Sequence, residues 1–302
     1  MNNAIRRKKY KRRRRHAFWA FILTVTAVSV VVIAACIFSE SRAGGRLFSA
    51  VGAIFDNGEV SESIAQSMAG DRLVDDDMKG ALEILAQNDE KYRVLFENMD
   101  SYPKDLLELA VKNKEAVDFV LAYPENKDNV PVQTADEVQS GSAVHFLQWD
   151  KRWGYARYGD SFLAVSGCGP TALAMAAAGL TGDKTITPYA VASYAEQNGY
   201  YVDGVGSSWS LISEGCAHFG LRASELSLSY ESISAAIGAG QPVICSVRPG
   251  DFTTTGHFIV IYGQQDNRLK IYDPNSIVRS EQLWDYERVA GQINNLWAMS
   301  LA

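Results

Sequence analysis

The segment 166–171 (SGCGPT) places a cysteine, Cys168, where a reactive thiolate is favoured. An alanine-rich apolar stretch runs from Gly169 to Gly179 and predicts a helix. Unpaired N–H groups and the dipole at a helix N-terminus stabilise negative charge, and the glycines on both sides of the cysteine leave room for a substrate. Pro170 costs no hydrogen bond in a first turn. A buried structural cysteine is the alternative, but the pattern favours a nucleophile.

A thiolate nucleophile needs a base, and residues 40–302 contain three histidines, His145, His218 and His257. His257 follows a glycine and opens the run HFIVIY, whose β-branched and aromatic residues predict a strand. A histidine at the start of a buried strand can project from the sheet edge towards a helix N-terminus. The alternative is a structural histidine in the core, with both ring nitrogens hydrogen-bonded. The position at the strand start makes His257 the best candidate of the three.

An acid that orients the imidazole is the third requirement of such a site. Asp273 directly follows a second predicted strand, 269–272. If the two strands pair through the turn 263–268, the start of the first lies beside the end of the second. His257 and Asp273 then share one edge of the sheet. The segment DPN that begins at Asp273 is also an ordinary turn signal.

Motifs of several other chemistries are missing from the sequence. Residues 40–302 show no closely spaced cysteine or histidine ligands, so no metal site is predicted. No glycine-rich phosphate loop follows a strand and there is no Gly-x-Ser-x-Gly elbow, so no cofactor is expected. Cys216 and Cys245 could pair in an oxidising exterior, and their spacing leaves both states open.

Helical patterns come first in the last 160 residues, and strand patterns come second. Helices are predicted over 188–198, with Thr187 as the cap, and over 207–219 and 229–238. A short strand over 242–247 precedes the two strands already described. Helices followed by strands within one domain favour an α+β fold, with helices packed on an antiparallel sheet.

Charge is divided sharply along the chain. The 302 residues carry a net charge of −6, but residues 1–39 contain nine Lys or Arg and no Asp or Glu. This leaves 20 bases against 35 acids, or −15, for residues 40–302. The folded part is therefore acidic, and nucleic acid is not its expected partner. Hydrophobic residues make up 47 % and charged residues 21 %, which excludes a disordered or collagen-like chain.

An uncharged run occupies residues 17–38, directly after the nine bases. A helix of this length spans roughly 33 Å, enough for a hydrocarbon core of about 30 Å. The run is too long for a cleavable signal peptide, and the positive-inside rule places the tail 1–16 in the cytoplasm. The segment IAAC at 33–36 resembles a lipoprotein box, but the apolar run continues past Cys36. A single-pass signal anchor with an extracytoplasmic remainder is expected.

Composition divides the rest of the chain into four parts. Residues 39–75 carry glycines and acids with weak periodicity and are predicted to form a stalk. Residues 76–123 carry apolar side chains at spacings of three and four, which predicts a small bundle of three or four short helices. This segment is interpreted as a spacer or as a module that docks an unknown partner. A proline-containing linker over 124–142 then precedes the domain 143–302.

Together these motifs resemble a known family. QWD at 148–150, SGCGPT, GHFIVI around His257 and YDPN around Asp273 resemble the papain-like cysteine peptidases of family thirty-nine. That family includes the double-glycine leader peptidases of bacteriocin exporters and their stand-alone relatives. The resemblance covers roughly residues 143–302 and implies a papain-like peptidase domain. It also implies Cys168 as nucleophile, His257 as base and Asp273 as orienting acid.

The resemblance further implies a glutamine that stabilises the oxyanion, and Gln148 is the candidate. In the exporters this residue stands about half a dozen positions before the nucleophile, whereas Gln148 stands twenty before Cys168 and Phe162 occupies the usual position. A structural hydrogen-bonding role in the first strand is the alternative for Gln148. The backbone N–H of Cys168 supplies one oxyanion donor in either case. No ATP-binding domain follows, so coupling to transport is not expected.

These observations predict a membrane-anchored, extracytoplasmic cysteine peptidase of a bacterium that acts through a thioester acyl-enzyme. A cell-wall peptide amidase shares the same chemistry. Two alternatives are not enzymes. The first is a non-catalytic peptide-binding module on the same fold, and the second is a structural surface protein whose active part is the helical bundle. An intact set of Cys168, His257 and Asp273 favours the enzyme, because a binding module has no need of all three.

Overall fold

The computed structural model of the chain describes residues 75–141 and 144–302, all within one compact unit. The predicted tail (1–16), membrane helix (17–38) and stalk (39–75, apart from its last residue) lie outside the described residues. Within the described ranges no helix is both long and apolar enough to cross a bilayer. The membrane anchor therefore stays a prediction.

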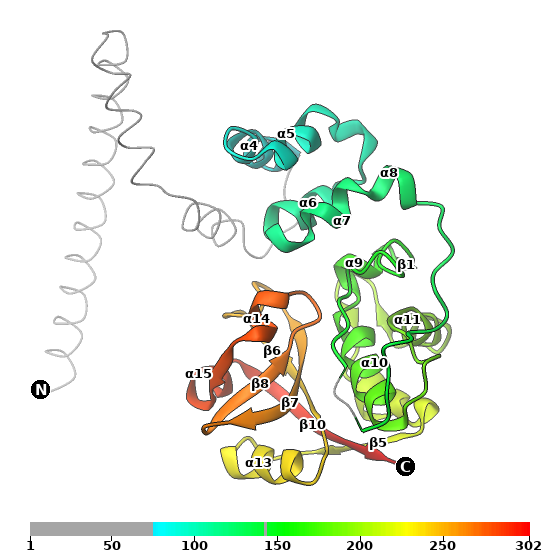
Figure 1. Cartoon of the computed structure of the whole chain (residues 1–302), viewed down its shortest axis with the longest axis vertical. Helices are drawn as coiled ribbons and strands as arrows, with labels where there is room; N and C mark the ends of the chain where they lie inside the picture. The colour runs from blue at the N-terminus through cyan, green and yellow to red at the C-terminus, as the bar shows by residue number, and fades with distance from the viewer. Residues whose placement is uncertain (1–74, 142–143) are drawn as a thin grey trace, which may run out of the picture. The chain divides into compact units, whose positions relative to one another are not determined.

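A six-stranded antiparallel sheet forms the centre of the C-terminal domain (Figure 1). Its strands, in spatial order, are β5 (Leu221–Glu225), β10 (Ile293–Leu301), β6 (Val243–Val247), β7 (His257–Gln265), β8 (Arg268–Tyr272) and β9 (Leu283–Asp285). All neighbouring pairs are antiparallel. The three predicted strands correspond to β6, β7 and β8, whereas β5, β9 and β10 were not predicted. The α+β class with helices on an antiparallel sheet is confirmed.

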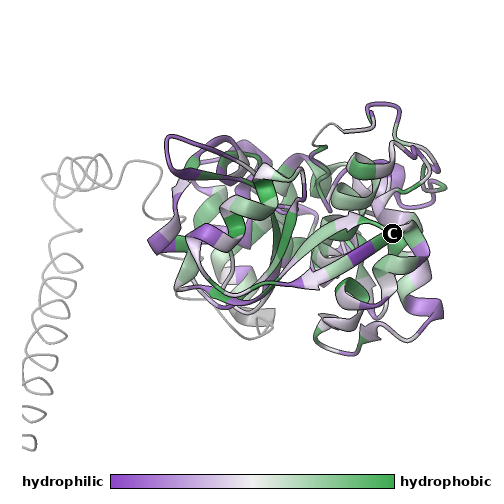
Figure 2. Cartoon of the chain, turned by 90° about the horizontal axis from the view of Figure 1, so that it is seen from below, coloured by the Kyte–Doolittle hydropathy of each residue, from purple (hydrophilic) through white to green (hydrophobic). Residues whose placement is uncertain are grey.

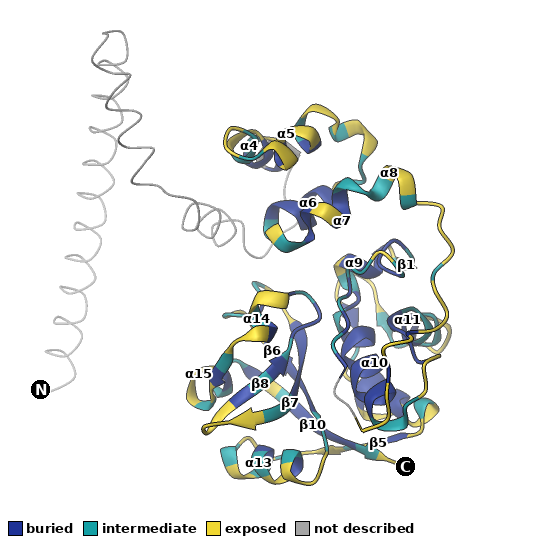
Figure 3. Ribbon diagram, in the orientation of Figure 1, coloured by how far each residue is buried: buried dark blue, intermediate teal, exposed yellow. Residues whose placement is uncertain are grey.

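Helices cover both faces of this sheet. Helix α10 (Cys168–Thr181) packs on one face, and α13 (Tyr230–Gly238) and α15 (Tyr286–Ala290) pack on the other. Successive side chains of β6 point to opposite faces, so Ile244 joins the core under α10 and Cys245 joins the core under α13. Because both faces are covered, β6 is buried along its whole length (Figure 3). Figure 2 shows the resulting division between apolar strands and polar outer turns.

Shorter elements complete the domain. They are β1 (Arg157–Tyr158), β2 (Ser161–Phe162), α9 (Leu163–Ser166), α11 (Pro188–Gln197), β3 (Tyr201–Val202), β4 (Gly206–Ser207), α12 (Ser210–Ser213), η3 (Gly215–Phe219) and α14 (Ile277–Glu281). The hydroxyl of Thr187 accepts from the N–H of Ala190 and caps α11. Ser229 caps α13 in the same way through Ser232 N.

The prediction of one helix over 207–219 is wrong. The backbone of Ser207 pairs with Tyr201 in the β3–β4 hairpin, which an α-helical residue cannot do. The hydroxyl of Ser207 also bonds that of Tyr158 at 2.7 Å in the interior. Only the short helices α12 and η3 follow, so these tertiary contacts outweigh the local helical pattern.

The helical segment before the linker, residues 75–126, shares a hydrophobic core with the C-terminal domain. Its elements are α4 (Asp75–Ala86), α5 (Glu90–Glu97), η1 (Met99–Ser101), α6 (Lys104–Lys112), η2 (Lys114–Ala116), α7 (Val117–Leu121) and α8 (Tyr123–Asn126). Tyr155 of the C-terminal domain stacks on Phe119 with 4.2 Å between ring centroids, and its hydroxyl donates to Phe119 O at 2.7 Å. Phe162 and Ala164 join the same buried cluster. The segment therefore packs as part of the domain.

Candidate active site

Cys168 is the first residue of α10 and is partly accessible to solvent. The other described cysteines, Cys216 and Cys245, are free and buried. The expectation that the flanking glycines leave room for a substrate is wrong. A Cβ at Gly167 would lie 2.3 Å from Leu163 O, and one at Gly169 would lie 2.7 Å from the Ser207 side chain. The protein itself fills the space beside both glycines, so their role is close packing around the turn that carries the thiol.

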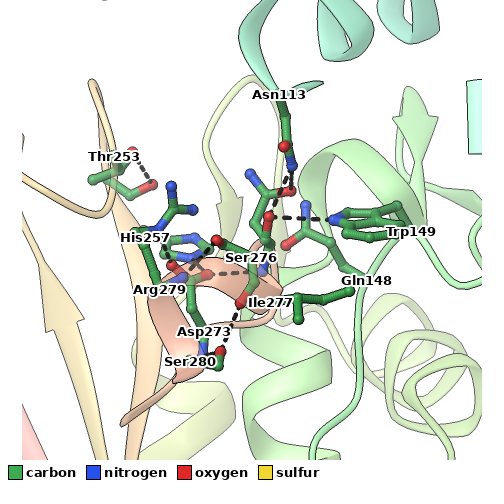
Figure 4. A network of polar contacts seen from close by, with 12 residues as sticks. Asn113, Gln148, Trp149, Thr253, His257, Asp273, Ser276, Ile277, Arg279 and Ser280 are labelled. Carbon is green, nitrogen blue, oxygen red and sulfur yellow. Dashed lines mark hydrogen bonds and ion pairs between the residues drawn. The ribbon is translucent and has the colours of Figure 1, made fainter. Parts of the chain in front are cut away.

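His257 is the first residue of β7, opposite Val247 of β6, and its side chain is buried. Its ring Nε2 lies 2.7 Å from Oδ1 of Asp273 (Figure 4). The start of α10 lies against the start of β7, because a Cβ at Gly169 would lie 3.5 Å from the ring of Phe258. The thiol of Cys168 raises the pKa of His257. The structure therefore brings His257 and Asp273 into direct contact. A catalytic set of Cys168, His257 and Asp273 stays a prediction.

Asp273 follows β8 and has no exposed surface. Its Oδ1 accepts from His257 and from the N–H of Asn275, both at 2.7 Å. Its Oδ2 accepts from Nε of Arg279 at 2.6 Å. A buried carboxylate is stable only when such donors replace water, so these contacts keep Asp273 ionised and fix its orientation.

Three further residues hold Asp273, Arg279 through its carboxylate and Ser280 and His145 through its backbone, and sequence reasoning did not assign them to the site. Arg279 and Ser280 lie on α14, and Ser280 Oγ accepts from Asp273 N at 2.9 Å. His145, which stacks on Tyr272, lies 2.9 Å from Asp273 O through its Nε2. Burial lowers the pKa of His145. The contact with Asp273 and the neighbouring negative charges raise it by less, so the pKa lies below its usual value. No local pattern marks these residues. The fold of the loop after β8 brings Arg279 and Ser280 to Asp273, and His145 reaches it from a segment 128 residues earlier.

Electrostatics favour a charged His257–Asp273 pair. Burial opposes the imidazolium, but the charge and hydrogen bond of Asp273 and the contact with Cys168 outweigh it and raise the pKa of His257 to about 9. Burial likewise opposes the Asp273 carboxylate, but His257 and Arg279 outweigh it and lower the pKa of Asp273 to about 2. The pair stays ionised through neutral pH.

The raised pKa of His257 predicts a loss of stability at alkaline pH. A histidine whose pKa is about 9 when folded and about 6.5 when unfolded contributes fully below pH 6.5, and this contribution disappears as pH rises through 9. We expect the free energy of unfolding, measured with urea between pH 6 and pH 9.5, to fall by about 3 kcal/mol relative to His257→Gln. Glutamine can still donate to Asp273 but does not titrate in this range. A difference between the two proteins that is constant with pH would contradict the expectation.

The side chain of Gln148 lies beside the turn before Cys168. Its Nε2 donates to Ala164 O at 2.7 Å and makes a longer contact, 3.3 Å, with Val165 O. Its Oε1 is buried without a hydrogen-bond partner among the described residues. One amide proton is therefore committed to the backbone, and a role in the oxyanion site requires the second proton to turn from Val165 O towards the substrate. The role of Gln148 stays a prediction.

Comparison with known proteins identifies the family of the chain. A profile of the Peptidase_C39 like family matches residues 142–300, more than half of the chain. The chain therefore belongs to this peptidase family, and its membership points to cysteine peptidase chemistry.

Two solved structures are similar to parts of the chain. The peptidase domain of Streptococcus ComA, a bi-functional ABC transporter involved in a quorum-sensing pathway, has 25 % identity and a TM-score of 0.35, covering 45 % of this chain and 91 % of that chain. A protein from Bacillus anthracis described as a C39-like peptidase has 18 % identity and a TM-score of 0.34, covering 54 % of this chain and 96 % of that chain. No curated protein matches the chain.

Proposed function

We propose that this protein is a membrane-anchored cysteine peptidase that hydrolyses peptide bonds outside the cytoplasm. The observation that carries the proposal is the buried ion pair of His257 and Asp273 at the start of β7. Cys168 begins α10, whose first turn packs against Phe258, the residue after His257. Membership of a peptidase family supports the same chemistry. A nucleophile, a base and an acid that orients the base are what amide hydrolysis through an acyl-enzyme requires.

The reaction follows from the positions of these groups. Nε2 of His257 is occupied by Asp273, so Nδ1 is the nitrogen that holds the proton given up by the thiol of Cys168, and with this proton His257 is the imidazolium of the ionised pair. The thiolate attacks the substrate carbonyl, and the N–H of Cys168 donates to the oxygen that becomes negative. The imidazolium then protonates the leaving amine as the C–N bond breaks, which leaves a thioester. Water, deprotonated by His257, attacks the thioester and releases the carboxylic acid and the free cysteine.

The membrane anchor is the second part of the proposal. It is supported by the uncharged run at 17–38 and the nine bases before it, which predict a helix with a cytoplasmic N-terminus. The site would then lie outside the cytoplasm, tethered through the stalk at 39–75. Secreted peptides, leader sequences and cell-wall peptides are the substrate classes within reach of such a site.

A single preparation can test both parts. Cells that express the full chain are separated into membrane and soluble fractions, and the membranes are incubated with a mixture of synthetic peptides. We expect the chain in the membrane fraction with Met1 or Asn2 as its first residue, and new peptide termini in the mass spectra. A lipidated Cys36 at the N-terminus would replace the spanning helix with a lipid anchor.

Other outcomes distinguish the alternative functions. Cleavage confined to branched cell-wall peptides would identify an amidase of the cell wall. Peptides that are retained but not cleaved, equally by wild type and Cys168→Ala, would show a binding module and overturn the peptidase. A chain found only in the soluble fraction would overturn the anchor.

A further inference from the structure

The loop that carries Asp273 is held by a part of the chain far away in sequence. This loop, residues 273–281, includes α14 and is called the acid loop below. It contacts Asn113 and Glu115, which lie at the start of η2 in the helical segment 75–126. These two residues lie outside the family match at 142–300.

Glu115 binds the N-terminus of α14. Its Oε2 accepts from the N–H of Ile277 at 2.7 Å and from that of Val278 at 3.2 Å. Its Oε1 accepts from the hydroxyl of Ser276, whose own oxygen caps α14 by accepting from Arg279 N at 3.0 Å. A five-residue helix is unstable by itself, because its first N–H groups have no partners within the helix. Glu115 supplies those partners.

Asn113 binds the residues just before α14. Its Nδ2 donates to the backbone oxygen of Asn275 at 2.8 Å and to the side-chain oxygen of Asn275 at 3.0 Å (Figure 4). Its Oδ1 accepts from the N–H of Glu115 at 3.0 Å, which orients both side chains towards the acid loop. Trp149 Nε1 donates to the backbone oxygen of Asn275 at 3.2 Å.

These contacts lead directly to the candidate site. Helix α14 carries Arg279 and Ser280, and both bond Asp273, at 2.6 Å and 2.9 Å. Asp273 in turn holds His257 at 2.7 Å. A shift of α14 therefore changes the donors of the Asp273 carboxylate, and with them the orientation of the imidazole.

We propose that Glu115 and Asn113 are positioning residues for Asp273, so that the helical segment 75–126 is a working part of the peptidase. The inference rests on the proposed function for its catalytic meaning. The segment shares its core with Tyr155 and Phe162, so a truncated chain would expose apolar surface and is unsuitable as a test. Point substitutions in the full chain, kept in a mild detergent, are the suitable test.

Three variants probe the contact. Glu115→Ala removes the cap, Glu115→Gln keeps the size and one acceptor, and Asn113→Asp replaces the donor to Asn275 by an oxygen that repels it. Glu83→Ala is the matched control, because it removes an exposed acid from α4 of the same segment. Thermal melting of each variant gives the temperature range in which the variant is folded, and the kinetic assays are carried out within that range.

The measurements separate positioning from a general loss of stability. We expect Glu115→Ala and Asn113→Asp to lower kcat about tenfold per folded molecule with KM changed less than about twofold, because a barrier change of about 1.4 kcal/mol gives tenfold in rate. Glu115→Gln should recover part of the loss. In NMR spectra of labelled histidines the pKa of His257 should fall from about 9 towards 6.5. Glu83→Ala should match the wild type in every respect.

Two different results would distinguish a failure of the positioning role from a failure of the proposed function. Wild-type kcat and a wild-type pKa of His257 in Glu115→Ala and Asn113→Asp would overturn the positioning role, even if both variants melt earlier. If the wild type cleaves no peptide but the pKa of His257 still falls in these variants, the proposed function fails and the positioning of Asp273 by the helical segment stands.

Discussion

Replacing Cys168 by alanine is expected to abolish peptide cleavage. In the proposed mechanism the acyl-enzyme forms on the sulfur of Cys168, and the other described cysteines are buried away from solvent. We expect a fall of at least about 10⁴-fold in kcat, to the limit of detection, when cleavage of a peptide found with the wild type is followed by chromatography. Stability should change by less than about 1 kcal/mol, because the side chain is partly exposed and adds little to the core.

The matched control is Cys216→Ala, which removes a buried thiol whose hydrogen bond goes to Leu221 O. It should keep wild-type turnover when the protein is folded. Iodoacetamide should label Cys168 in the native wild type and leave Cys216 unmodified, as seen in the masses of tryptic peptides. Cleavage by Cys168→Ala at a rate near that of the wild type would refute the assignment of the nucleophile.

Replacing Asp273 by asparagine is expected to have the second largest effect. The isosteric amide cannot pair with both His257 and Arg279, since each contributes an N–H donor at 2.7 Å and 2.6 Å. Loss of the oriented imidazole should lower kcat by about 10²–10⁴-fold and leave weak activity, because the thiol and the ring are still present. The half-buried Arg279 also loses its counter-charge, which should cost about 1–3 kcal/mol of stability.

Urea unfolding and steady-state kinetics on the same preparation separate these two effects. Asp285→Asn is the matched control, because it makes the same change at an exposed position of β9, next to β8. It should leave both kcat and the free energy of unfolding unchanged within about 0.5 kcal/mol. Wild-type kinetics for folded Asp273→Asn would show that the imidazole does not need this carboxylate. The catalytic groups would then be Cys168 and His257 alone.

Local patterns in the sequence were sufficient to predict that Cys168 begins a helix and that His257 and Asp273 lie together. Cys168 stands at the start of α10 because glycines and an alanine-rich apolar run define a helix N-terminus. His257 and Asp273 are sixteen residues apart and flank a hairpin, and antiparallel pairing of adjacent strands brings such ends together. These inferences depend on backbone propensity and on short loops, both of which a single sequence displays.

Longer-range features were missed or mispredicted for a common reason. Strands β5 and β10 pair with each other across more than sixty residues, and β4 interrupts the helix predicted over 207–219. Side-chain burial and pairing with distant segments decide such elements, and both can outweigh local propensity.

What the sequence by itself determined is therefore the class of the fold, the order of the chemical groups and the two ends of the β7–β8 hairpin. Only the tertiary structure decided how Asp273 is held, because Arg279 and Ser280 meet it within the acid loop and His145 reaches it from a distant segment. It also decided that Glu115, more than 150 residues away, stabilises that loop. A buried carboxylate needs every acceptor site filled, and the donors that fill them come from whichever segments the packed core brings to that point.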